Sequence, residues 1–141
     1  MDTPGGYPSA MDTTAELIAR LAAAPAQAPL VADVVFEDYG QSTTYAGREA
    51  AITVLRAYFG GGFSDGRMYI HATVYDAKAI VLAFTFRGRH DGAFLGIPAT
   101  GKEVAVPMIL LCHTTNQQIQ RIACYYDAGT ILRQLGLTLV Q

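Results

Sequence analysis

The chain has 141 residues, of which 51% are hydrophobic and only 16% are charged. This length is enough for one domain with a sizeable core. Because soluble domains usually carry about 25% charged residues, we expect much apolar surface to be hidden in an internal cavity, in a homodimer interface, or in both. The net charge of −2 and the lack of a basic run argue against nucleic acid and membrane surfaces as partners.

The cysteines and histidines indicate no metal site. Cys112 and Cys124 fall in predicted strands, where we expect buried free thiols, although a disulfide between neighbouring strands stays open. His71, His90 and His113 belong to different predicted elements and do not have the spacing of metal ligands. The sequence contains no signal-peptide pattern, and no apolar run approaches the ~20 residues of a membrane span. We therefore expect a cytoplasmic protein without metal or other cofactor.

The first part of the chain predicts helices. Residues 1–10 are rich in proline, glycine and polar residues, so we expect a disordered leader followed by a single domain over residues 11–141. Asp12 is a candidate N-cap for a helix that reaches residue 24, and a short helical turn is expected over residues 26–31.

A strand, a loop and a second helix are expected next. The strand covers residues 34–39, and the helix begins near residue 47. Three successive glycines, 60–62, end this helix. The same glycines could also serve as a hinge at the mouth of a pocket.

The rest of the chain predicts four long strands and a short closing helix. One irregular segment, residues 90–102, interrupts them with three glycines and a proline. Helices followed by strands in hairpins predict an α+β fold, with the helices on one face of an antiparallel sheet. Because that face is strongly apolar, we expect the sheet to curl around a cavity. The strands are predicted over residues 68–76, 79–89, 103–115 and 118–127.

Asp127 stands between the last predicted strand and the closing helix. A carboxylate at the end of an apolar strand is costly unless it is paired, solvated or used. It could cap the helix, or it could act as an acid/base in the cavity with a pKa raised by desolvation. Tyr125, expected on the same strand face, would then bind a substrate oxygen.

Two further polar residues are candidates for the cavity. Asp38 ends an apolar strand, and it could start a turn before Gly40 or act as a second acid/base. His90 follows an apolar strand, and it could brace the irregular segment or face the cavity. Six larger residues are expected to line the core or the substrate cavity: Phe36, Tyr58, Phe86, Met108, Leu110 and Tyr125.

Residues 90–102 read H-D-G-A-F-L-G-I-P-A-T-G-K, and the chain later carries Tyr126-Asp127 and Gln134-Leu135-Gly136. These motifs resemble those of SnoaL-like polyketide cyclases. The resemblance implies a nuclear transport factor 2-like (cystatin-like) α+β barrel with a cone-shaped, curved sheet. It also implies a cofactor-free intramolecular aldol cyclisation, in which Asp127 is the acid/base and His90 polarises the carbonyl.

Residues 37–41 and 47–49 resemble the segment that carries the base in ketosteroid isomerases. This second resemblance implies the same barrel and a proton-shuttling role for Asp38. However, the expected first helix holds no tyrosine, and Ile109 stands near the position of that family's protonated carboxyl. Steroid isomerisation is therefore not expected.

Arg89, Asp91 and Asp127 are similar to the Asp-Arg-Asp arrangement of limonene-epoxide-hydrolase-like enzymes, which use the same barrel. There, one carboxylate activates water and the other protonates the epoxide. The simpler interpretation of Arg89 and Asp91 is a surface ion pair, which stabilises little.

Three hypotheses follow for the function. The first is a SnoaL-like acid/base enzyme that acts on an apolar, carbonyl-rich small molecule, with polyketide-type aldol cyclisation as the leading reaction. The second is an epoxide hydrolase or an epoxide-opening cyclase. The third is a non-catalytic binding or dimerisation module.

Overall fold

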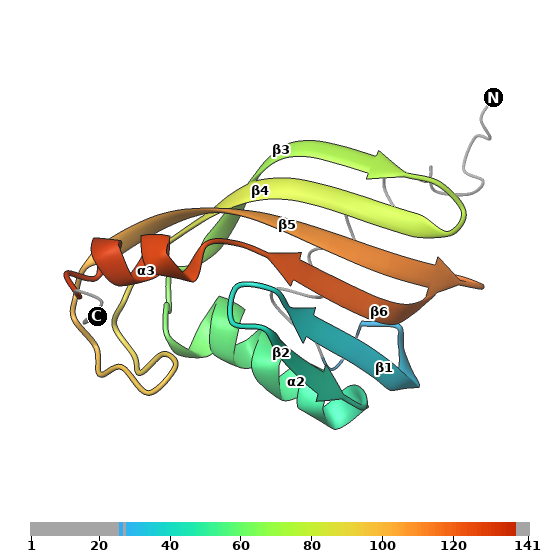
Figure 1. Ribbon diagram of the computed structural model, residues 1–141, viewed down its shortest axis with the longest axis horizontal. Coiled ribbons are helices and arrows are strands. Elements are labelled where there is room, and N and C mark those ends of the chain that lie inside the picture. The colour runs from blue at the N-terminus through green and yellow to red at the C-terminus, as the bar shows by residue number, and fades with distance from the viewer. Residues whose placement is uncertain (1–25, 27, 138–141) are drawn as a thin grey trace.

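The computed structural model describes residues 26 and 28–137 of the chain. Its centre is one curved sheet of six strands in the order β2-β1-β6-β5-β4-β3 (Figure 1). The predicted leader and the predicted first helix lie outside the described residues. The strands are β1 (Leu30–Asp38), β2 (Thr43–Ala46), β3 (Arg67–Tyr75), β4 (Ala79–Arg89), β5 (Glu103–Thr115) and β6 (Gln118–Tyr125). The helical segments are α2 (Arg48–Arg56), the five-residue π-helical turn η2 (Ala57–Gly61) and α3 (Ala128–Gln134).

The sheet is mixed, whereas a purely antiparallel one was expected. Strand β1 runs parallel to β6, with Phe36 opposite Ile122 and Asp38 opposite Cys124. All the other neighbouring strands are antiparallel. Hairpin patterns fix the direction only of strands that are neighbours in sequence, and a parallel pair needs a long connection. In this chain, nearly the whole domain lies between β1 and β6.

The start of the sheet also differs from the prediction. Leu30 and Val31 begin β1, so the helical turn expected over residues 26–31 is wrong there. Residues 43–46 were assigned to a loop but form the edge strand β2, paired with β1. Strand β2 is short and mostly exposed, and it therefore lacks the apolar alternation by which a strand is recognised.

Side-chain alternation in β4 and β5 builds the core. Every second residue is buried from Ile80 to Phe86 in β4 and from Val104 to Cys112 in β5, and these residues form one apolar cluster with the buried side of α2. Burying one such side chain stabilises the fold by roughly 1.5–3 kcal/mol. Cys112 and Cys124 belong to the same cluster as free, buried thiols.

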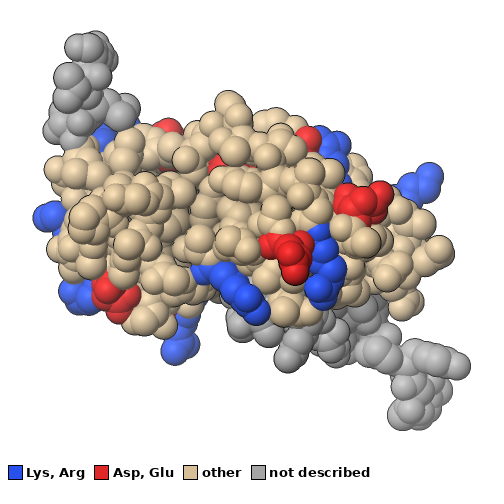
Figure 2. Space-filling view, turned by 90° about the horizontal axis from the view of Figure 1, so that it is seen from below, with Lys and Arg blue, Asp and Glu red and all other residues tan. Residues whose placement is uncertain are grey.

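The opposite face of the sheet carries exposed apolar residues. Tyr39, Ile109 and Tyr125 are 45%, 43% and 41% exposed, and the rings of Tyr39 and Tyr125 stack with centroids 4.5 Å apart. Figure 2 shows the charged side chains of one face of the molecule as separate groups on a largely uncharged surface. The homodimer expected from the composition remains a prediction. Among the helices that the structure describes, none is long and apolar enough to cross a membrane.

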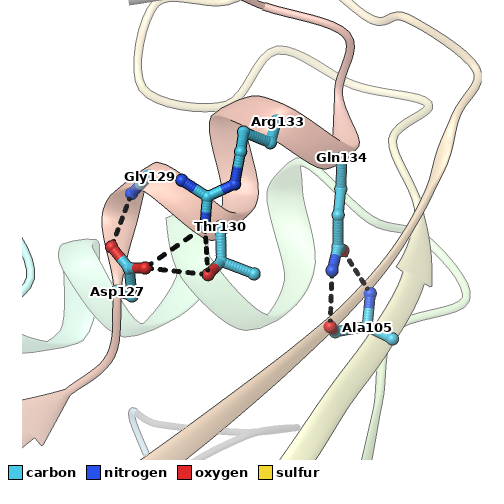
Figure 3. A network of polar contacts seen from close by, with 6 residues as sticks. All are labelled: Ala105, Asp127, Gly129, Thr130, Arg133 and Gln134. Atoms are coloured by element: carbon cyan, nitrogen blue, oxygen red, sulfur yellow. Dashed lines mark hydrogen bonds and ion pairs between the residues drawn. The ribbon is translucent and has the colours of Figure 1, made fainter.

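Gln134 joins α3 to β5 through two hydrogen bonds (Figure 3). Its Nε2 donates to the carbonyl oxygen of Ala105 at 2.9 Å, and the Ala105 amide donates to its Oε1 at 2.7 Å. The pairing of β5 with β6 begins only at Ile109, so Ala105 lacks a strand neighbour on that side. The side-chain amide therefore takes the place of a β-strand backbone.

We predict that Gln134→Ala lowers the free energy of unfolding by about 1–3 kcal/mol, because both backbone groups of Ala105 lose their partner. Urea denaturation followed by circular dichroism measures this change. Gln118→Ala, at an exposed position of β6, serves as the control and should leave stability nearly unchanged. Equal stability of the two variants would contradict the role given to Gln134.

Candidate functional site

A buried carboxylate lies at the end of β1. Asp38 is only 1% exposed. Its Oδ2 accepts hydrogen bonds from the Tyr126 hydroxyl at 2.8 Å, from Gln41 Nε2 at 3.1 Å and from the Tyr58 hydroxyl. Its Oδ1 accepts from the Gln41 amide at 2.9 Å. Four donors surround this carboxyl group, which matches an ionised carboxylate, since that form can only accept.

The two phenols above Asp38 stay protonated. Burial is the main cause that raises the pKa of both Tyr58 and Tyr126 well above the ordinary value of 10.0. The hydrogen bond to Asp38 raises both pKa values further. Gln41 Nε2 also lies 3.1 Å from the Tyr58 hydroxyl and 3.0 Å from the Tyr126 hydroxyl. These side chains come from η2, from the end of β6 and from the turn after β1, so the tertiary fold assembles the cluster.

Gly40 makes room for the Tyr126 ring. A Cβ atom at position 40 would lie 2.4 Å from Cζ of that ring, closer than two non-bonded carbon atoms can approach. The glycine is therefore required by a close contact, not by an unusual backbone angle.

A small apolar cavity adjoins the cluster. It encloses about 10 Å³, roughly the space for one water molecule, because large side chains fill the interior of the curved sheet. The two phenols belong to its wall and Asp38 does not, so the carboxylate lies behind the tyrosines. The wall consists of Tyr58, Phe63, Phe86, Phe94, Val104, Val106, Met108, Tyr126 and Ile131.

His90 is fully buried beside this cavity. Its Nδ1 accepts the backbone N–H of Thr100 at 3.2 Å and lies 3.0 Å from the Thr100 hydroxyl. The proton of the neutral ring therefore belongs on Nε2, which has no partner among the described residues. The centroid of its ring lies 5.5 Å from the centroid of the Phe63 ring and 6.5 Å from that of the Phe94 ring. Both phenylalanines line the cavity.

Asp127 does not lie in the cavity. It is the N-cap of α3 and accepts from the Gly129 amide at 3.0 Å and from the Thr130 hydroxyl at 2.9 Å (Figure 3). Its side chain is 69% exposed and pairs with Arg133 at 3.4 Å. The bond from Thr130 is the first of several that lower the pKa of Asp127. The expected desolvated carboxylate with a raised pKa is therefore wrong, since the carboxylate is both solvated and well bonded.

Arg89, Asp91 and Asp127 do not converge. Arg89 pairs with Glu103 at 3.2 Å on the surface. Asp91 is exposed and accepts from the Ser64 amide and hydroxyl, and these bonds lower its pKa. The arrangement expected for an epoxide enzyme is therefore absent from this part of the chain.

The residues expected to line a substrate cavity divide into three groups. Tyr58, Phe86 and Met108 belong to the cavity wall, while Phe36 and Leu110 are buried in the core outside it. Tyr125 is on the other face of the sheet, stacked on Tyr39, so its predicted contact with substrate is wrong. The reason is strand alternation, which turns Cys124 and Tyr126 inward and Tyr125 outward.

Comparison with known proteins identifies the family. The family model of the SnoaL-like polyketide cyclases matches residues 9–135. The chain belongs to the SnoaL-like polyketide cyclase family. No curated protein matches its sequence. Among the residues that the structure describes, no group of three or more histidine, cysteine, aspartate or glutamate side chains could hold a metal ion.

Solved structures share this SnoaL-like fold at low sequence identity. A protein from Jannaschia sp. CCS1, named as a candidate SnoaL-like polyketide cyclase, is 20% identical over 96% of this chain and 100% of its own, with a TM-score of 0.76. A Catenulispora acidiphila protein with a ketosteroid isomerase-like fold is 20% identical over 92% and 96%, with a TM-score of 0.72. IdmH from Streptomyces antibioticus, a candidate polyketide cyclase, is 21% identical over 90% and 98%, with a TM-score of 0.68. These similarities confirm the predicted fold class.

Sequence reasoning missed Tyr126 and Gln41 as members of the site. Tyr126 was noted only as a motif residue beside Asp127, and Gln41 only as the end of a strand-loop segment. Two signals in the sequence could have indicated them. Tyr126 is two residues after the apolar Cys124, which places both on one face of an extended segment. Gln41 is three residues after Asp38, the spacing at which a turn returns an amide to an aspartate.

We predict that Gly40→Ala displaces Tyr126 and lowers the free energy of unfolding by about 1–3 kcal/mol, the usual cost of overpacking. The added methyl group cannot coexist with the ring where it now lies. The double variant Gly40→Ala/Tyr126→Ala frees that space, so the two changes should be far from additive in urea denaturation. Additive effects on the free energy of unfolding would show that the contact between position 40 and the Tyr126 ring does not cause the loss of stability.

We predict that Asp127→Ala lowers Tm at neutral pH, because α3 loses its N-cap. The folded-state pKa of Asp127 is below its ordinary value of 3.8, so its contribution is complete above that pH and is lost as the pH falls through the folded-state pKa. The Tm difference from wild type should therefore shrink in acid. Asp127→Asn keeps a capping residue and should lose less. A difference independent of pH would contradict the role of the carboxylate.

Proposed function

We propose that this SnoaL-like protein is a cofactor-free acid/base enzyme that acts on an apolar, carbonyl-containing small molecule, with Asp38 as the group that transfers the proton. One observation carries the proposal: a buried carboxylate lies beneath two protonated phenols in the wall of an apolar cavity. Burying an ionised group is expensive, and packing alone would be served by an apolar residue at the end of β1.

The arrangement suits the formation of an enolate. Asp38 removes a proton from the carbon next to a carbonyl, and the bonding electrons move onto the carbonyl oxygen. A phenol that turns from Asp38 towards that oxygen stabilises the developing charge, and also frees a lone pair of Oδ2 for the proton. Tyr58 and Tyr126 can both do this, since their raised pKa values keep them as donors.

Aldol cyclisation follows from the same groups. The enolate carbon attacks a second carbonyl of the same molecule, so a carbon–carbon bond forms and the second oxygen becomes an alkoxide. Asp38, now protonated, returns its proton to that alkoxide, directly or through a phenol, and the ionised carboxylate is restored. The N–H of His90 is the other candidate donor to a substrate oxygen, because it is buried without a hydrogen-bond partner among the described residues.

This proposal changes the role expected of Asp127. As the cap of α3, Asp127 positions a helix whose Ile131 lines the cavity. It therefore supports the site without touching the substrate. Of the alternatives, the epoxide reaction lacks its converging side chains. A binding or dimerisation module is favoured by one observation, the small volume of the cavity.

We predict that Asp38→Asn slows proton transfer by about 10²–10⁴-fold, the usual contribution of a positioned acid/base. Proton–deuterium exchange next to the carbonyl of 2-tetralone, followed by NMR, measures this step without knowledge of the natural substrate. Tyr126→Phe should slow it by about 10²-fold, as the loss of one oxyanion donor does.

Asp127→Asn is the matched control and should exchange at nearly the wild-type rate. Circular dichroism checks that each variant is folded. If folded Asp38→Asn exchanges as fast as wild type, Asp38 is not the base. If wild type shows no exchange above the buffer rate with any carbonyl compound tested, the binding module becomes the better interpretation.

A further inference from the structure

The cavity needs to grow before it can hold a ligand, and its walls differ in how they are held. Seven of the nine lining residues belong to strands, helical segments or the end of β6, as the lining and the element bounds show. Moving those residues would break the sheet or a helix. Phe63 and Phe94 lie in connections, and Phe94 is the one carried by the irregular segment of residues 90–102.

Residues 90–102 form a loop with a closed base and a tight tip. At the base, the His90 amide donates to the Lys102 carbonyl and the Gly101 amide donates to the His90 carbonyl, both at 2.8 Å. At the tip, Phe94 and Ile97 pair around Leu95 and Gly96, whose φ angles are 52° and 77°. Two central residues with positive φ are typical of a tight hairpin turn. The tip can therefore move as one unit.

Few polar contacts hold this loop against the rest of the protein. The amides of Asp91 and Gly92 share the Gly62 carbonyl, each at 3.2 Å. The Asp91 carboxylate binds the Ser64 amide at 2.9 Å and the Ser64 hydroxyl. Asp91 and Ser64 are both exposed, so water can replace these bonds at small cost.

The loop rests on the glycine run, which consists of Gly60, Gly61 and Gly62 at the end of η2. A Cβ at Gly62 would come within 2.8 Å of the Phe94 Cβ, and a Cβ at Gly92 would come within 2.4 Å of the Gly61 carbonyl oxygen. The absence of side chains thus lets the loop approach closely. The centroid of the Phe94 ring lies 5.7 Å from that of Tyr58 and 5.2 Å from that of Phe63.

We propose that Phe94 is the gate and the size filter of the cavity: the loop swings about its closed base, where His90 stays in place, and the ligand takes the position of the Phe94 ring. This inference rests on the proposed function in taking the cavity as the ligand site. It defines the ligand as a molecule with a planar apolar ring and a hydrogen-bond acceptor. Withdrawal of Phe94 uncovers the N–H of His90, which then meets that acceptor.

A reversible disulfide that holds the loop closed, called the lock below, tests the movement. In Ser64→Cys/Asp91→Cys the two thiols replace side chains that touch each other, so a disulfide would hold the loop closed. Binding of 2-naphthol, which has apolar rings and an oxygen, is followed by fluorescence and calorimetry. We expect the oxidised variant to bind at least about 10-fold more weakly than the reduced one, because the open form is no longer populated. A reductant should restore binding.

Two controls accompany the lock. Ser64→Cys alone, oxidised in the same way, should bind like wild type, since Cys112 and Cys124 are buried. Thiol counting confirms that the disulfide forms in the double variant. If the oxidised and reduced double variants bind 2-naphthol equally, the loop is not the gate.

Removal of the Phe94 ring is the second test of the proposal. Phe94→Ala should bind 2-naphthol about 10-fold more tightly than wild type, because no ring has to be displaced. Leu95→Ala changes the exposed neighbour in the same turn and should leave binding unchanged. Equal binding by these two variants, or no binding by either, overturns the role of Phe94.

These outcomes are separate from those of the proton-transfer test. Binding of 2-naphthol requires no base. Adding Phe94→Ala to the Asp38→Asn variant should therefore still increase its affinity for 2-naphthol. A protein that gates 2-naphthol but exchanges no protons would retain the gate and lose the proposed reaction. A protein that exchanges protons with the loop locked would retain the reaction and lose the gate.

Discussion

The hydrogen bonds to the buried Asp38 carboxylate are the interaction on which the site depends. Three side chains from separate parts of the fold donate to it: Tyr58, Gln41 and Tyr126. Each donor lowers the free energy of a charge that would otherwise be expensive to bury. In return the carboxylate fixes two phenols in the cavity wall. The same arrangement places the Tyr126 ring against Gly40, where a side chain would not fit.

The long strands could be predicted from the sequence, because their residues alternate without interruption between turns. The expected bounds of the strands over residues 79–89 and 103–115 agree with β4 and β5. The edge strand β2 and the first residues of β1 could not be predicted in this way. Their conformation comes from pairing with β1 and with the remote β6, respectively, and local sequence carries little information about distant partners.

The candidate site was predicted less well than the fold. Asp38 and His90 were identified as buried-site candidates, and both are buried. The error at the end of β6 concerned neighbouring residues: the motif drew attention to Asp127, while Tyr126 beside it holds the inward position. A sequence shows that a polar residue ends an apolar strand, but not whether it turns inward or caps the next helix. That choice depends on the partners that tertiary structure brings, such as Gln41 or Thr130.

The parallel pairing of β1 with β6 has a consequence for folding and synthesis. Asp38 and Tyr126 are 88 positions apart in sequence, and contacts of such long range form late and slowly. Until β6 docks, the carboxylate lacks one of its phenols and β1 lacks a neighbour on one edge. A chain emerging from the ribosome therefore cannot complete the hydrogen bonds around Asp38 before Tyr126 and most of the residues ahead of it have been made. The buried carboxylate gains its full set of donors only when β6 has docked against β1.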